Sequence, residues 1–213
     1  MNSSSKYRES VHPLRTRLRE ETSKAILQAA EQAIGELGFA AARIEDVAAR
    51  AGVSVGTVYN HFEDRDALVE ALVTHRREEL TGRIDEALRR SAAEGFAAQL
   101  ETFVRALLEH FEAHRAFLSA LLEGEHARTR SPVGPRNARP NAALLEVHRR
   151  AEKLVKRGLA EGALRGTGSE LFPEYLVGAV RGALLHEVYQ PGSVPLADRA
   201  PEIVRFFLQG ARG

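Results

Sequence analysis

The sequence predicts an all-α protein, with an N-terminal three-helix domain that contains a helix-turn-helix and a C-terminal helical bundle. Ala, Leu, Glu and Arg dominate the 213 residues, a composition that favours helices. Apolar residues recur at steps of three and four, and no sustained apolar/polar alternation stands between turn signals. We therefore expect about nine helices and essentially no strands.

Composition limits the possible classes of protein. With 44% hydrophobic and 28% charged residues, the chain can bury a substantial core. The net charge of +1 carries no overall signature of nucleic-acid binding, so such binding depends on where the basic groups lie. The absence of cysteine excludes disulfides and thiolate zinc sites. Residues 1–20 contain no apolar leader and Arg181 interrupts the apolar stretch 175–185, so we expect a cytoplasmic protein.

The chain begins with a segment, residues 1–21, that is Ser-rich and then basic, and we expect a flexible arm. Two interpretations stay open: the arm contacts phosphates or a minor groove, or it is a solvated tail. Thr22 is a suitable N-cap for a first helix that ends near Gly38. Its apolar face consists of Ile26, Ala29, Ala30, Ala33, Ile34 and Leu37.

Two short helices joined by a tight turn should follow, which is a helix-turn-helix. The first carries apolar residues on one side, namely Ile44, Val47, Ala48 and Ala51. Gly52 favours the positive φ of the turn, and Ser54 is a good N-cap for a helix that runs to about His61. Val58 and Phe62 are its expected buried residues.

The remaining elements complete the bundle. Asp64 should cap a fourth helix that runs to about residue 92, with a kink or break at Gly82 as an open alternative. Further helices are expected over residues 96–114, 116–128, 141–164, 170–189 and 199–211, with Pro-rich loops over 131–140 and 190–197. The predicted domains are an arm (1–21), a helix-turn-helix domain (22–65) and a ligand-binding, dimerising domain (66–213).

The N-terminal motifs resemble the tetracycline-repressor (TetR) family. The matching residues are Ile26, Leu27, Ala29, Ala30, Gly38, Phe39, Asp46, Val47, Ala48, Ala51, Gly52, Val53, Ser54, Gly56, Thr57, Val58, Tyr59, His61, Phe62, Arg65 and Leu68. The resemblance implies a homodimeric repressor that binds double-stranded palindromic operator DNA and is released by a small-molecule effector.

The predicted DNA-binding residues lie on and around the third helix: Arg43, Ser54, Val55, Gly56, Thr57, Tyr59, Asn60, His61 and Arg65. Gly56 lets DNA approach the backbone, the hydroxyls of Thr57 and Tyr59 can donate to phosphates, and Asn60 can read a base edge. The helix N-terminus at Ser54 also favours a phosphate. His61 contacts a phosphate or has a structural role, and both interpretations stay open.

Three positions bear on how far the resemblance extends. The family often has Ser or Thr where Arg43 stands and a basic or polar residue where Val55 stands. Arg43 can contact a phosphate, and Val55 can contact a thymine methyl, so the operator sequence cannot be copied from relatives. Arg65 occupies a position where the family commonly has Lys, and we expect it to hold a phosphate.

The C-terminal domain offers an effector pocket and a dimer interface. The expected pocket suits a largely apolar effector and is lined by Phe103, Leu107, Phe111, Phe117, Leu121, Leu144, His148 and Tyr175. Small residues of the penultimate helix and apolar residues of the last helix predict the interface, which consists of Gly178, Ala179, Gly182, Ala183, Val204, Phe207 and Leu208. In the resembling family the last two long helices pair with their counterparts.

We predict neither an enzyme nor a cofactor or metal site. His110, Glu112 and His114 form a tempting cluster, but the His-Glu-x-x-His pattern is missing and local spacing supplies no third ligand. No phosphate loop, nucleophile elbow or paired-carboxylate motif is present. Two alternatives stay open: an activating or ligand-independent DNA-binding regulator, and a helical small-molecule carrier or enzyme.

Overall fold

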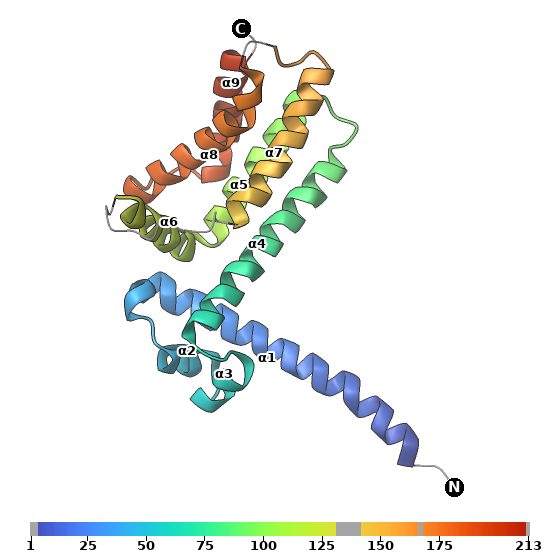
Figure 1. Ribbon diagram of the computed structural model, residues 1–213, viewed down its shortest axis with the longest axis vertical. Coiled ribbons are helices and arrows are strands. Elements are labelled where there is room, and N and C mark those ends of the chain that lie inside the picture. The colour runs from blue at the N-terminus through green and yellow to red at the C-terminus, as the bar shows by residue number, and fades with distance from the viewer. Residues whose placement is uncertain (1–3, 131–141, 166–167, 212–213) are drawn as a thin grey trace. The chain divides into compact units, whose positions relative to one another are not determined.

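The computed structural model describes residues 4–130, 142–165 and 168–211, with side-chain surroundings from residue 14 onward except 123–130, 143 and 211. These residues form helices and connecting turns without any strand, so the all-α prediction is confirmed for the described chain. The chain divides into two compact units, residues 1–73 and 74–213. Figure 1 shows the helices along the chain. The expected loop 131–140 lies outside the described residues.

The first unit begins with α1 (Ser4–Ala41), which is longer than expected. The expectation that residues 1–21 form an arm and that Thr22 caps the first helix was wrong for the residues from Ser4 onward. The Thr22 hydroxyl donates to the carbonyl of Leu18 (2.8 Å), one turn back inside the helix. Arg, Leu and Glu, which favour helices, extend α1 toward the N-terminus. Gly38 interrupts α1 near its end with φ 80° and ψ 165°.

The helix-turn-helix consists of α2 (Ile44–Ala51) and α3 (Val55–His61). Gly52 has the expected left-handed conformation, with φ 67°. Ile44, Val47 and Ala48 of α2 pack with the α1 face, which is buried as predicted except for Leu37. Val58 is fully buried, whereas Phe62 is only half-buried because it lies at the C-cap of α3.

A long helix, α4 (Arg65–Arg90), contributes residues to both units. Asp64 caps it as predicted, because its Oδ1 accepts from the N–H of Ala67 (2.7 Å). Leu68 and Leu72 are buried in the first unit and Ile84 is buried in the second. The helix continues through Gly82, so the expected break at this residue was wrong.

The second unit contains the rest of the bundle. Its helices are α5 (Phe96–Ala113), α6 (Arg115–Arg130), α7 (Ala142–Ala160), α8 (Phe172–Tyr189) and α9 (Ala200–Ala211), with 3-10 turns η1 (Ser169–Leu171) and η2 (Leu196–Arg199). One apolar core joins Ile84 of α4 to residues of α5, α7, α8 and α9. None of the helices in the described ranges is sufficiently long and apolar to span a membrane.

A buried carboxylate holds the connection between α8 and α9. Glu187 is almost completely buried and pairs with Arg115 Nη1 (2.8 Å). Its Oε1 also accepts from the backbone N–H of Gly192 (3.2 Å). Nearby, Glu112 accepts from the N–H of Leu196 (3.2 Å). A buried charge is stable only when it is paired, so the Glu187 carboxylate keeps these partners. The contacts therefore hold the loop that leads into α9 in place.

Candidate functional site

The third helix presents a small polar face to solvent. Gly56, Tyr59 and Asn60 are exposed, and the Tyr59 side chain is 51% exposed despite its large apolar ring. Val58 on the opposite side of α3 is 0% exposed and anchors the helix to the first unit. A Cβ added at Gly56 would meet no atom closer than Ser54 Oγ at 3.7 Å. This face has room for the close approach of another molecule.

The N-terminus of α3 is fixed by its own side chains. Ser54 Oγ accepts from the backbone N–H of Thr57 (3.1 Å), as predicted for an N-cap. The hydroxyls of Ser54 and Thr57 lie 2.9 Å apart, and either can donate. Val55 is half-buried, and His61 is half-buried beside the Phe62 ring, with a centroid distance of 6.2 Å. These hydrogen bonds therefore hold the N-terminus of α3 in one conformation.

Arg43 keeps the surroundings expected of a phosphate contact. It is exposed and lies at the N-cap of α2, where its backbone N–H donates to Asp46 Oδ2 (3.0 Å). Asp46 thus supplies half of a capping box, which explains how α2 begins without a Ser or Thr. The prediction that Arg43 contacts a phosphate depended on its position at a helix N-terminus and on its positive charge.

Arg65 makes contacts within the first unit that the sequence did not predict. Its Nε donates to the carbonyl of Ala42 (3.0 Å), and its Nη2 donates to the carbonyl of Phe39. The guanidinium therefore closes the turn between α1 and α2, and the expected contact of Arg65 with a phosphate stays a prediction. Sequence reasoning missed this contact because its partners lie more than 20 residues earlier.

The eight expected pocket residues differ in burial, and none of them lines the pocket found among the described residues. Phe103, Phe111 and Phe117 are fully buried, and Leu107 is 8% exposed, so these four residues belong to the packed interior. Leu144 and Tyr175 are exposed, by 37% and 57%, respectively. Leu121 is half-buried, and His148 Nε2 lies 3.1 Å from Glu174 Oε1. The pocket that the described residues form contains none of these eight residues.

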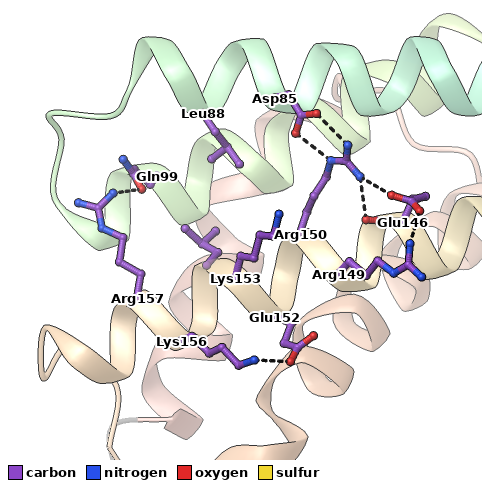
Figure 2. A pocket seen from close by; sticks show the side chains of 11 residues that line it. Asp85, Leu88, Gln99, Glu146, Arg149, Arg150, Glu152, Lys153, Lys156 and Arg157 are labelled. Atoms are coloured by element: carbon purple, nitrogen blue, oxygen red, sulfur yellow. Dashed lines mark hydrogen bonds and ion pairs between the residues drawn. The ribbon is translucent and has the colours of Figure 1, made fainter.

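A pocket of about 610 Å³ lies instead among α4, α5 and α7 (Figure 2). It is lined by Asp85, Leu88, Gln99, Glu146, Arg149, Arg150, Glu152, Lys153, Leu154, Lys156 and Arg157. Arg150 stands between two carboxylates, donating to Asp85 through Nε and Nη2 (2.8 Å each) and to Glu146 through Nη1 (2.9 Å). The pocket is strongly charged, unlike the largely apolar one expected.

Ion pairs shift the pKa values of several residues that line this pocket. The hydrogen bond from Arg150 lowers the pKa of Asp85 below its ordinary value, against a smaller opposing effect of burial. Arg150 also lowers the pKa of Glu146 through a hydrogen bond, and the bond to Asp85 raises the pKa of Arg150. Lys156 lowers the pKa of Glu152 in the same way. These groups therefore stay ionised at neutral pH.

The expected dimer residues fall into two classes. Gly178 and Gly182 of α8 are exposed, Ala179 and Ala183 are half-buried, and a Cβ at either glycine would meet no atom within 4 Å. On α9, in contrast, the expected interface residues were wrong: Val204, Phe207 and Leu208 are buried within one chain. The Phe207 ring contacts the Phe172 ring edge-on at 6.1 Å. Phe206, which was not among the expected interface residues, is 72% exposed.

Comparison with known proteins identifies the first unit. Residues 26–72 match the model of a family described as "Bacterial regulatory proteins, tetR family". The HTH-type transcriptional repressor Rv3405c of Mycobacterium tuberculosis is 38% identical over 128 residues. The match covers 60% of this chain and 58% of the relative, so the chain spans less than two thirds of the relative's length.

Solved structures extend the likeness to the fold of both units. The fatty acid degradation regulator FadR of Bacillus halodurans has a TM-score of 0.72 at 18% identity, over 89% of this chain and 99% of that one. FadR of Bacillus subtilis, solved with stearoyl-CoA, has a TM-score of 0.71 at 15% identity, over 88% and 98% of the two chains. Residues 26–72 therefore match the tetR family of bacterial regulatory proteins, and the solved structures extend the likeness of fold over most of the chain.

Proposed function

We propose that the protein is a ligand-responsive transcriptional regulator, a homodimer that represses by binding a palindromic operator and leaves it when a small molecule binds. The observation that carries the proposal is the exposed face of α3, with Gly56, Tyr59 and Asn60, on a helix-turn-helix matched by the family model. A helix of this kind reads base edges in the major groove. The relative from M. tuberculosis is named a repressor, which supports the direction of regulation.

Symmetric dimerisation through α8 and α9 supports operator recognition. Tyr175, Gly178, Gly182 and Tyr189 recur at helical spacing along α8, and all are exposed. Phe206 of α9 adds an exposed ring. Glycines flanked by aromatic rings allow close approach of a second helix, and a twofold dimer presents two α3 helices to successive half-sites.

The effector proposed here is an organic molecule with an anionic group. The pocket among α4, α5 and α7 is lined by five basic side chains and three carboxylates. Lys153 lies within it, whereas Arg149, Arg150, Lys156 and Arg157 are engaged by hydrogen bonds. One structural neighbour, FadR of B. subtilis, was solved with stearoyl-CoA, which supports a small organic effector.

Selection of bound fragments from the host genome tests the proposal. The full-length protein should enrich a short, roughly palindromic sequence, and its position relative to the promoter should distinguish repression from activation. Asn60→Ala should relax the base preference at one position of each half-site by about 1–3 kcal/mol. The matched control is Gln209→Ala, which changes an exposed residue of α9 and should leave the base preference unchanged.

Failure of the selection would favour the rival class. A helical carrier or enzyme, with the N-terminal helices used only for assembly, would yield no sequence-specific footprint. An operator bound equally well by wild type and Asn60→Ala would move base recognition away from α3. Operator binding that no small anionic compound weakens would support a ligand-independent regulator.

A further inference from the structure

Two histidines of α5 face a glutamate of α4 inside the second unit. His110 and His114 lie one helical turn apart, with ring centroids separated by 4.7 Å. Glu79 contributes a carboxylate, and His114 Nε2 lies 3.3 Å from its Oε2. One potential ligand atom from each of the three residues lies within 4.8 Å of the other two. Bonds of about 2.0–2.1 Å to a shared tetrahedral ion require the three atoms to close by up to about 1.5 Å.

His110 supplies a nitrogen that the fold leaves unused. The residue is 3% exposed, and its Nδ1 is buried without a hydrogen-bond partner among the described residues. Buried polar atoms normally have a partner, so this nitrogen is an exception that needs a reason. Burial, with a smaller contribution from the neighbouring His114, lowers the pKa of His110 to about 4.

The Glu79 carboxylate is oriented by arginines. Arg76 Nη1 lies 2.6 Å from Oε2, and Arg83 Nη2 lies 3.3 Å from Oε1. A carboxylate has about four lone-pair directions, so it can keep a guanidinium and bind an ion. Groups that orient a ligand in this way are typical of the surroundings of metal sites.

We propose that Glu79, His110 and His114 form a binding site for a divalent transition-metal ion, most suitably Zn²⁺. Two imidazole nitrogens and one carboxylate oxygen are a ligand set that zinc takes in proteins, and they leave a fourth position for water or another ligand. The positive charge of Arg76 repels a bound cation. We therefore expect this site to bind the ion less tightly than a structural zinc centre does. The ion would tie the second half of α4 to the end of α5.

Direct titration with the metal alone tests the site. The full chain, purified without a polyhistidine tag, is titrated with Zn²⁺ against a chelating dye, and bound metal is counted by mass spectrometry after dialysis. Wild type should hold one ion per chain and unfold at a higher temperature with Zn²⁺. Co²⁺ should give the visible absorption of a four-coordinate N and O site.

Glu79→Gln and His114→Asn should each weaken Zn²⁺ binding by more than roughly 100-fold, because even changes to outer groups cost 10–100-fold. The matched control is His148→Asn, which removes a histidine from the exposed pair with Glu174 and should bind as wild type. Circular dichroism checks that each variant is folded, and the near-isosteric Glu79→Gln decides the outcome if His114→Asn unfolds. Wild type without a bound ion, or folded variants that bind as wild type, would overturn the proposal.

Discussion

At the scale of single residues, two arginines of the first unit, Arg43 and Arg65, have different surroundings. Arg65 donates to the carbonyls of Phe39 and Ala42, and thereby joins the start of α4 to the turn between α1 and α2. Arg43 is exposed at the start of α2. Because a guanidinium with protein acceptors is already engaged, we expect Arg65 to act on stability and Arg43 to act on DNA.

Arg65→Ala should lower the free energy of unfolding of the first unit by about 1.5–3 kcal/mol, the usual contribution of hydrogen bonds from a charged group. Arg43→Ala should change stability by less than about 0.5 kcal/mol but reduce the salt dependence of operator binding by roughly one phosphate contact per protomer. Urea unfolding followed by circular dichroism and DNA titrations at several salt concentrations measure both effects. A stable Arg65→Ala protein with a reduced salt slope would restore a phosphate-binding role for Arg65.

At the scale of helices, close packing of α7 on α5 depends on one glycine. A Cβ added at Gly158 would lie 2.5 Å from the ring of Phe96, which is 4% exposed at the start of α5. The ring cannot move into solvent without losing its buried apolar area, and the surrounding core leaves it little room. The same addition at Gly82, in the exposed face of α4, would meet no atom within 4 Å.

Gly158→Ala should therefore destabilise the second unit by about 1–3 kcal/mol through overpacking, although alanine is the better helix former. Gly82→Ala makes the same chemical change without the clash, and it should stabilise the protein by about 0.5–1 kcal/mol. Thermal and urea unfolding of the two variants give the comparison. Equal stabilisation by both would show that the Phe96 ring can move aside at little cost.

At the scale of the whole molecule, the open side of α8 is where we propose that two chains associate. Gly178 and Gly182 leave free space in a single chain, so a larger side chain is tolerated there until a second helix approaches. The buried Val204, Phe207 and Leu208 already pack inside one chain. Substitutions at the α8 glycines therefore test assembly separately from folding.

Gly182→Leu should shift the dimer toward monomer by about 1–3 kcal/mol, because the added side chain forces paired helices apart. Its helix content should equal that of the wild type. Sedimentation velocity over a range of concentrations measures the association, and Gly82→Leu on α4, which also has open space at its Cβ, is a matched control. A Gly182→Leu protein that remains as dimeric as the wild type would move the interface away from this part of α8.

The sequence alone determined the helices and the caps of the helix-turn-helix. Ser54, Asp64 and Gly52 act on residues no more than five positions away, through hydrogen bonds that helix geometry fixes. The buried residues Ile26, Val47 and Val58 followed from the same short-range periodicity. The resemblance to the tetR family, carried by these local motifs, was confirmed for the same reason.

Only the tertiary structure decided which distant residues meet. The partners of Arg65, the approach of Glu79 to His110 and His114, and the charged pocket all join segments that spacing does not relate. On α9, periodicity identified an apolar helix but could not assign Phe207 to the core and Phe206 to solvent. A helix repeats every 3.6 residues whatever packs against it, whereas the face that becomes buried depends on the neighbouring helices.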